Sequence, residues 1–176
     1  NFTKDFQFTT EITLKDEKLD TIDKTKLLGT IITNDLKWHE NTKYIVKKAN
    51  QKMRLLHKFA KFTTNKSHLI HIYNSQVRGN LEYCSTVWHS GLTESDTKDI
   101  ERVQKAAVRI FMGNKYQGYE QALKMLKLDS LKERRIKMAL NFAKRSLKLE
   151  HFSKSLMSIR NLEKYPYIKG CMCLCL

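Results

Sequence analysis

The chain has 176 residues, 41% of them hydrophobic and 29% charged, which is enough to bury the core of one domain. Its 33 Lys and Arg residues exceed its 18 Asp and Glu residues, and the formal charge of +15 favours a nucleic acid or an anionic membrane as partner. One Pro and six Gly are too few for the many turns of a β-sandwich or barrel, so we expect a mainly α fold.

The sequence shows neither a membrane span nor a disulfide framework. It has no apolar run of about 18 residues and no secretion signal at its start, so we expect an intracellular protein. Cys84 stands alone and the other cysteines crowd into CMCLCL at 171–176, without the paired Cys-x-x-Cys spacing of zinc sites. We expect no metal and no other cofactor in this chain.

The first 34 residues predict β structure. Residues 6–14, FQFTTEITL, alternate apolar and polar side chains, which is the period of a half-buried strand. After a turn, LDTI at 19–22 and KLLGTIIT at 26–33 are expected as partner strands, with Gly29 marking a bulge or a close backbone approach. We assign residues 1–34 to an antiparallel β-hairpin or a three-stranded sheet.

From residue 35 the periodicity becomes helical, and residues 35–149 predict a bundle of about five helices. The first long helix, within 43–62, has one apolar face. The opposite face carries cations within roughly 60° of arc and no acid: Lys43, Lys47, Arg54, Lys58 and Lys61. A solvated surface would also place charge there, but it would add neutralising Glu-to-Lys pairs, so this first basic stripe predicts contacts with a polyanion.

A second helix is expected over 66–77, and its two histidines are too few to form a metal site. The next stretch, VRGNLEYCSTVW at 77–88, fits neither the helical nor the strand period. We predict a loop there, with Tyr83 and Trp88 as aromatic anchors.

A further helix is predicted between a capping segment at 93–96 and Gly113. Its second basic stripe consists of Lys98, Arg102, Lys105 and Arg109. Because Asp99 and Glu101 flank this stripe, a solvated face and a nucleic-acid-binding face are equally compatible with it.

The last helices are expected at 119–128 and after Ser130, which has capping-box spacing to Glu133. The long final helix has apolar residues on two faces, so it predicts neighbours on two sides. Residues 150–176 lose the pattern and are assigned to a tail, for which disorder and truncation are both open explanations.

Taken in order, several of these segments resemble the carboxy-terminal part of the reverse transcriptases of non-LTR retrotransposons, the jockey-like and related LINE elements. The resemblance covers roughly residues 5–149 and rests on KLLGTIITNDLKW, the Lys-rich helix, VRGNLEYCSTVW, IERVQKAAVRIFMG and LDSLKERR. It implies that residues 1–34 correspond to the palm edge and its primer-grip hairpin, and that residues 35–149 correspond to the thumb. The primer-grip-like residues are Lys26, Leu27, Leu28 and Gly29. The family often has Pro near position 79, where this chain has Gly79.

The resemblance also implies a function and its limits. A thumb holds template and primer by the backbone, so the partner would be RNA, DNA or a hybrid duplex, and the location would be nuclear. Glu82 would pair with an Arg of a basic helix, while Tyr83 and Trp88 anchor its segment. The sequence has no adjacent aspartates to hold two metal ions, so we expect no polymerase activity and assign magnesium only to a complete polymerase. Apolar surface left open by the missing palm and fingers would favour self-association.

One alternative from another class is kept. Residues 43–62 also have the form of a basic amphipathic helix that binds an anionic membrane or a calmodulin-like groove. The four further segments in family order argue against an isolated peptide motif. Independent catalysis by Cys84 is not expected, because His89 is near in sequence but no orienting acid is identifiable.

Overall fold

The computed structural model describes residues 13–15, 17–63, 65–146 and 148–149. The tail at 150–176 and most of the strand expected at 6–14 lie outside these residues. Within them, two small antiparallel hairpins precede the helices, which confirms the mainly α prediction. The main helices are α1 (His39–Phe62), α2 (Lys66–Ile72), α5 (Glu94–Met112), α6 (Tyr119–Leu126) and α7 (Leu131–Ser146).

The β structure differs in detail from the prediction. Strands β1 (Thr13–Leu14) and β2 (Glu17–Lys18) form one hairpin, and β3 (Lys24–Leu27) and β4 (Thr30–Thr33) form another. The stretch KLLGTIIT is therefore not one strand, the stretch LDTI is not a strand, and the described residues form no three-stranded sheet.

The turn of the second hairpin explains this error. Leu28 and Gly29 connect β3 to β4 with positive φ values of 47° and 86°, the signs found at both central positions of a type I′ turn. Leucine rarely adopts a positive φ, so the residues at this position did not predict a turn. The close approach predicted at Gly29 is confirmed, because a Cβ there would lie 3.3 Å from Cε1 of Tyr83.

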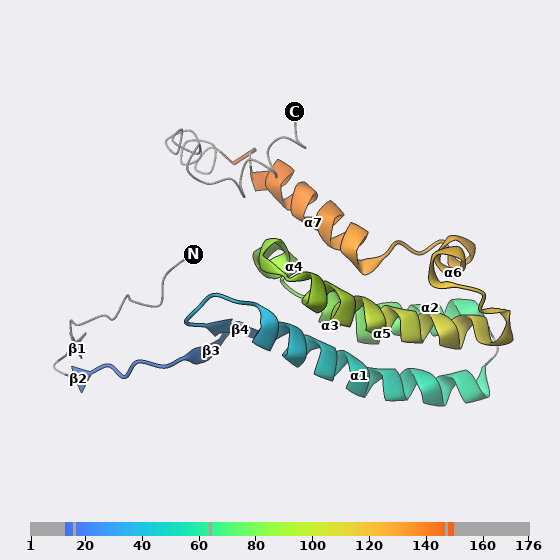
Figure 1. Cartoon of the computed structure of the whole chain (residues 1–176), viewed down its shortest axis with the longest axis horizontal. Coiled ribbons are helices and arrows are strands. Elements are labelled where there is room, and N and C mark those ends of the chain that lie inside the picture. Colours follow the sequence, from blue (N-terminus) through green and yellow to red (C-terminus); the bar gives the residue numbers. More distant parts are fainter. Residues whose placement is uncertain (1–12, 16, 64, 147, 150–176) are drawn as a thin grey trace.

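The core lies among α1, α5 and the segments between them, with α1 and α7 on opposite sides of α5 (Figure 1). On α1 the predicted apolar face is buried at Ile45, Ala49, Met53 and Leu56, whereas Phe59 is 42% exposed. The β3–β4 hairpin lies beside the start of α1, where the side-chain oxygen of Asn41 accepts a hydrogen bond from the Ile31 amide at 3.1 Å.

The segment predicted as a loop is a chain of short helices. A π-helix, η1 (Tyr73–Arg78), leads into α3 (Gly79–Glu82), α4 (Ser85–Trp88) and the 3-10 turn η2 (His89–Gly91). The helical period is lost because the π turn changes the residues per turn and because Cys84 interrupts the helix with φ 50°. The loop prediction for 77–88 was wrong for these two reasons.

The two aromatic anchors have different surroundings. Trp88 is fully buried, and its indole Nε1 donates a hydrogen bond to the backbone oxygen of Tyr83 at 2.9 Å. Tyr83 is 51% exposed, so it is not the buried anchor that was expected. Its hydroxyl instead donates to the backbone oxygen of Leu28 at 2.9 Å and holds the hairpin tip.

Capping residues set the predicted starts of α5 and α7. The Thr93 hydroxyl accepts from the Asp96 amide at 3.1 Å, and Asp96 accepts in return from the Thr93 amide at 3.3 Å. Ser130 and Glu133 exchange the equivalent bonds at 3.1 and 3.2 Å. Asp96 also lies 2.8 Å from Nδ1 of His39, and this pair joins the starts of α5 and α1.

Neither of the two apolar faces predicted on α7 is covered along its whole length within the described residues. Leu131 and Phe142 share one face, and Leu131 is fully buried at the start of the helix whereas Phe142 near its other end is 56% exposed. On the other face Ile136 is 37% exposed. The expectation of neighbours on two sides is therefore met at one end of α7 within the described residues.

Candidate nucleic-acid interface

A groove of about 670 Å³ runs between α1 and α5. Its cationic lining comes from Lys43, Lys47 and Arg54 of α1 and from Arg102 of α5. The spacing of the three α1 residues places them within one arc of the helix, away from its buried residues, and Arg102 of α5 lines the same hollow. The structure thus brings residues of both predicted basic stripes to one hollow.

The other members of the stripes lie outside the groove lining. Lys58 and Lys61 are exposed farther along α1. On α5, Lys98 lies 3.8 Å from Glu94, the Lys105 ammonium lies 5.1 Å from the ring centroid of Tyr119, and Arg109 lies 5.4 Å from that of Tyr116. These three α5 cations thus have partners within the protein.

The cations that line the groove differ in their pairing. Lys43 lies 2.9 Å from Glu40, and the pKa of that carboxyl is lowered by its hydrogen bond to Lys43. Arg102 lies 3.0 Å from Asp99. Lys47 and Arg54 form no ion pair within the described residues, so their charges are open to an external anion.

The rest of the groove lining mixes apolar surface with amide groups. Val46, Val103 and Ala106 supply apolar surface, and Asn50 and Gln51 supply amide groups that donate and accept hydrogen bonds. Among the described residues, no aromatic side chain lines the groove, whereas proteins that bind single strands stack bases on such rings. The lining therefore offers positive charge, amide hydrogen-bonding groups and apolar surface.

The primer-grip-like residues Lys26, Leu27, Leu28 and Gly29 occupy the tip of the β3–β4 hairpin. Leu28 is 82% exposed at the turn. The ammonium groups of Lys26 and Lys48 each lie 4.9 Å from the ring centroid of Tyr44 on α1, and hydrogen bonds from Lys26 and Lys48 lower the pKa of the Tyr44 hydroxyl. Tyr44 was not singled out from the sequence, because its lysine partners come from two different elements.

Glu82 forms the arginine pair that was expected. Its carboxylate accepts from Nε of Arg134 at 2.5 Å and from Nη2 at 3.0 Å, and Nε of Arg78 lies 3.7 Å away. The hydrogen bond to Glu82 raises the pKa of Arg134, whereas burial lowers that of Arg78. The pair fastens α7 to the η1–α3 segment.

Arg135, the next residue on α7, is fully buried, and its guanidinium nitrogens have no hydrogen-bond partner among the described residues. Burial lowers its pKa. Glu101 lies nearby and accepts from the Tyr119 hydroxyl and, at 3.1 Å, from the Leu131 amide, whereas its buried Oε2 has no hydrogen-bond partner among the described residues. Sequence reasoning missed Arg135 because LKERR reads as an exposed charged run.

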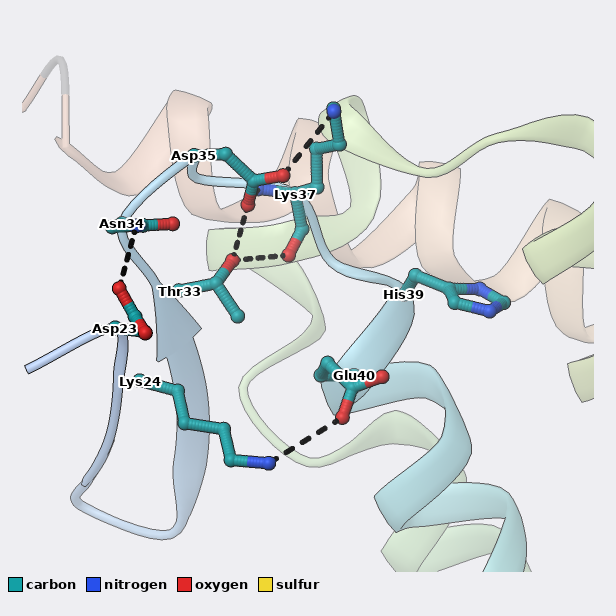
Figure 2. A pocket seen from close by; sticks show the side chains of 8 residues that line it. All are labelled: Asp23, Lys24, Thr33, Asn34, Asp35, Lys37, His39 and Glu40. Carbon is teal, nitrogen blue, oxygen red and sulfur yellow. Dashed lines mark hydrogen bonds and ion pairs between the residues drawn. The ribbon is translucent and has the colours of Figure 1, made fainter. Parts of the chain in front are cut away.

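A second, polar hollow of about 370 Å³ lies between the β3–β4 hairpin and the start of α1 (Figure 2). Asp35 accepts from the Thr33 hydroxyl at 2.6 Å and from the Lys37 amide at 3.1 Å, and these bonds lower its pKa to about 2. Asp23 accepts from Asn34, and Glu40 lies 3.9 Å from Lys24. The acids of this hollow are held by neighbouring side chains, and the described residues contain no group of acids, histidines or cysteines suited to a metal ion.

Comparison with protein-family models, curated proteins and solved structures finds no match to this chain. Among the described helices, none has the length and apolar content needed to cross a bilayer.

Proposed function

We propose that the chain binds double-stranded nucleic acid by its sugar-phosphate backbone, along the groove between α1 and α5. The observation that carries this proposal is the convergence of Lys43, Lys47 and Arg54 with Arg102 on one hollow, although the two stripes are far apart in sequence. Contacts with phosphate need Lys and Arg at suitable positions and no sequence code. Binding should therefore depend strongly on salt and weakly on sequence.

The dimensions favour a duplex. With a rise of about 1.5 Å per residue, the first stripe from Lys43 to Lys61 extends about 27 Å along α1. At about 3.4 Å per step of each strand, this length spans about eight phosphates. A rigid, straight row of cations fits the regular phosphate spacing of a duplex better than it fits a flexible single strand.

The resemblance to non-LTR reverse transcriptases suggests which biological role this binding would have. We propose that the chain is a thumb-like fragment that grips a template-primer duplex and has no polymerase centre of its own. The exposed Leu28 and Phe142 mark surfaces where the palm and fingers of a parent polymerase would pack, or where copies of this chain would associate. Catalysis and its magnesium are outside the proposal, because the sequence has no adjacent aspartates.

The alternative of a membrane-binding or calmodulin-binding helix is less favoured. Such a helix inserts its apolar face into a lipid surface or a partner's groove. In this protein Ile45, Met53 and Leu56 of α1 are buried in the core. The helix would have to leave the bundle to use them.

The proposal is tested by measuring affinity for two duplexes of unrelated sequence and for vesicles of phosphatidylserine and phosphatidylcholine. We expect similar affinities for both duplexes, a steep loss of affinity with salt, and weaker association with the vesicles. Binding to vesicles but not to either duplex would support the membrane alternative and contradict the proposal.

A further inference from the structure

Asp99 does not fit a groove that binds only phosphates. Among the described residues that line the groove it is the one acid, and its negative charge repels a phosphate. Its Oδ1 lies 3.0 Å from Nη1 of Arg102, whereas its second oxygen accepts no hydrogen bond from the described residues. The side chain is 34% exposed, so a ligand in the groove can reach that oxygen.

The neighbours of Asp99 indicate which ligand group would meet it. Val103 and Ala106 follow it at positions i+4 and i+7 on the same face of α5 and line the same groove. A sugar ring packs on such apolar surface, and a carboxylate beside it accepts a hydrogen bond from a sugar hydroxyl. Dinucleotide-binding folds use an acid toward a ribose hydroxyl in this way.

We infer that Asp99 makes the groove selective for strands that carry 2′-hydroxyl groups. Ribose offers the donor that this carboxylate lacks, and deoxyribose does not. In an A-form duplex the 2′-hydroxyls lie along the wide, shallow minor groove beside the backbone, where a protein that grips phosphates meets them. The inference rests on the proposed function, and it identifies RNA-containing duplex as the preferred ligand.

The competing explanation is that Asp99 only neutralises Arg102 as a surface pair at i, i+3. In that case the residue affects binding to all duplexes through charge alone. Removing it would strengthen binding to RNA and DNA duplexes by the same factor. The two explanations therefore differ in the ratio of the affinities and not in their absolute values.

The experiment measures fluorescence anisotropy with three duplexes of one sequence at one salt concentration: RNA, 2′-fluoro RNA and DNA. The fluoro duplex keeps the A-form but cannot donate a hydrogen bond, so it separates helix shape from the hydroxyl group. We expect the wild-type chain to prefer RNA over both others by about tenfold or more, the size of a hydrogen bond to a charged acceptor. Asp99→Ala should bring the three affinities together, and Asp99→Asn, which keeps an acceptor oxygen, should retain part of the preference.

The matched control is Glu94→Ala, which removes a different acid of α5, one that is exposed, pairs with Lys98 and lies outside the groove lining. It should leave the RNA-to-DNA ratio of the wild type unchanged. Equal binding of the three duplexes by the wild type, or a ratio unchanged by Asp99→Ala, would overturn the inference while the proposed function stands. Absence of binding to every duplex would overturn the proposed function and the inference together.

Discussion

Replacing Glu82 with Gln should destabilise the protein more than the loss of an exposed ion pair would. The Glu82 side chain is 12% exposed and binds Arg134, which is 30% exposed, through two hydrogen bonds, with Arg78 at 3.7 Å. Breaking a fully buried pair costs about 3 to 5 kcal/mol because an uncompensated charge is left behind. Since water partly screens Arg134, we expect a loss of about 2 to 4 kcal/mol in the free energy of unfolding. For a chain of this length that is a drop of roughly 5 to 12 °C in Tm.

The assay is urea unfolding followed by circular dichroism and Trp fluorescence, with Glu94→Gln as the control. Glu94 lies 3.8 Å from Lys98 in an exposed pair, so its replacement should cost less than about 0.5 kcal/mol. Arg134→Met, combined with Glu82→Gln, should recover part of the loss because one of the unpaired charges is then removed. Equal effects of Glu82→Gln and Glu94→Gln would refute the claim that this pair fastens α7 to the bundle.

Three further predictions concern the core and its ionisable groups. Trp88→Ala should lower the free energy of unfolding by about 3 to 5 kcal/mol, because Trp88 is fully buried. Cys84→Ser should lower it by much less, because Cys84 is only partly buried. Similar losses for the two variants in urea unfolding would contradict this prediction. Arg135→Met should stabilise the protein, because it replaces a buried cation that has no hydrogen-bond partner among the described residues with an apolar chain, and a drop in Tm would refute it. Burial raises the pKa of Asp96, but hydrogen bonds from Thr93 and His39 outweigh it and hold the pKa below its ordinary value. The ionised Asp96 therefore stabilises the fold above about pH 4, and this stabilisation is lost as the pH falls. The Tm of Asp96→Asn should change less with pH in that range than the Tm of the wild type. Parallel profiles of Tm against pH would contradict this prediction.

The local signals of the sequence predicted the helices well. The Thr93 and Ser130 caps and the apolar period of α1 depend on residues within one or two turns of each other, so the sequence alone shows them. The prediction for residues 77–88 was wrong because the conformation of this segment does not depend on local residues. Its π turn and the positive φ of Cys84 are held by surrounding packing, and no local residue pattern encodes them.

The sequence predicted the basic residues of the candidate site but not how the two helices place them relative to each other. Each basic stripe was visible in the sequence, but the rotation of each helix about its axis is set by tertiary packing. That rotation turns Arg102 toward the groove beside Lys47 and leaves Lys105 over Tyr119. The burial of Arg135 was equally invisible, because its covering residues come from distant elements.

The most direct measurement of the central claim is the dependence of duplex affinity on salt for a groove variant, Lys47→Gln/Arg54→Gln/Arg102→Gln. Its matched control, Lys124→Gln/Lys132→Gln/Lys144→Gln, removes the same charge from exposed positions on α6 and α7. If each groove cation contacts a phosphate, the slope of log affinity against log salt on DNA should flatten by about 2.7, at about 0.9 per contact, and the control should keep the wild-type slope. Equal slopes for the groove variant and the control would contradict the assignment of the α1–α5 groove as the nucleic-acid interface.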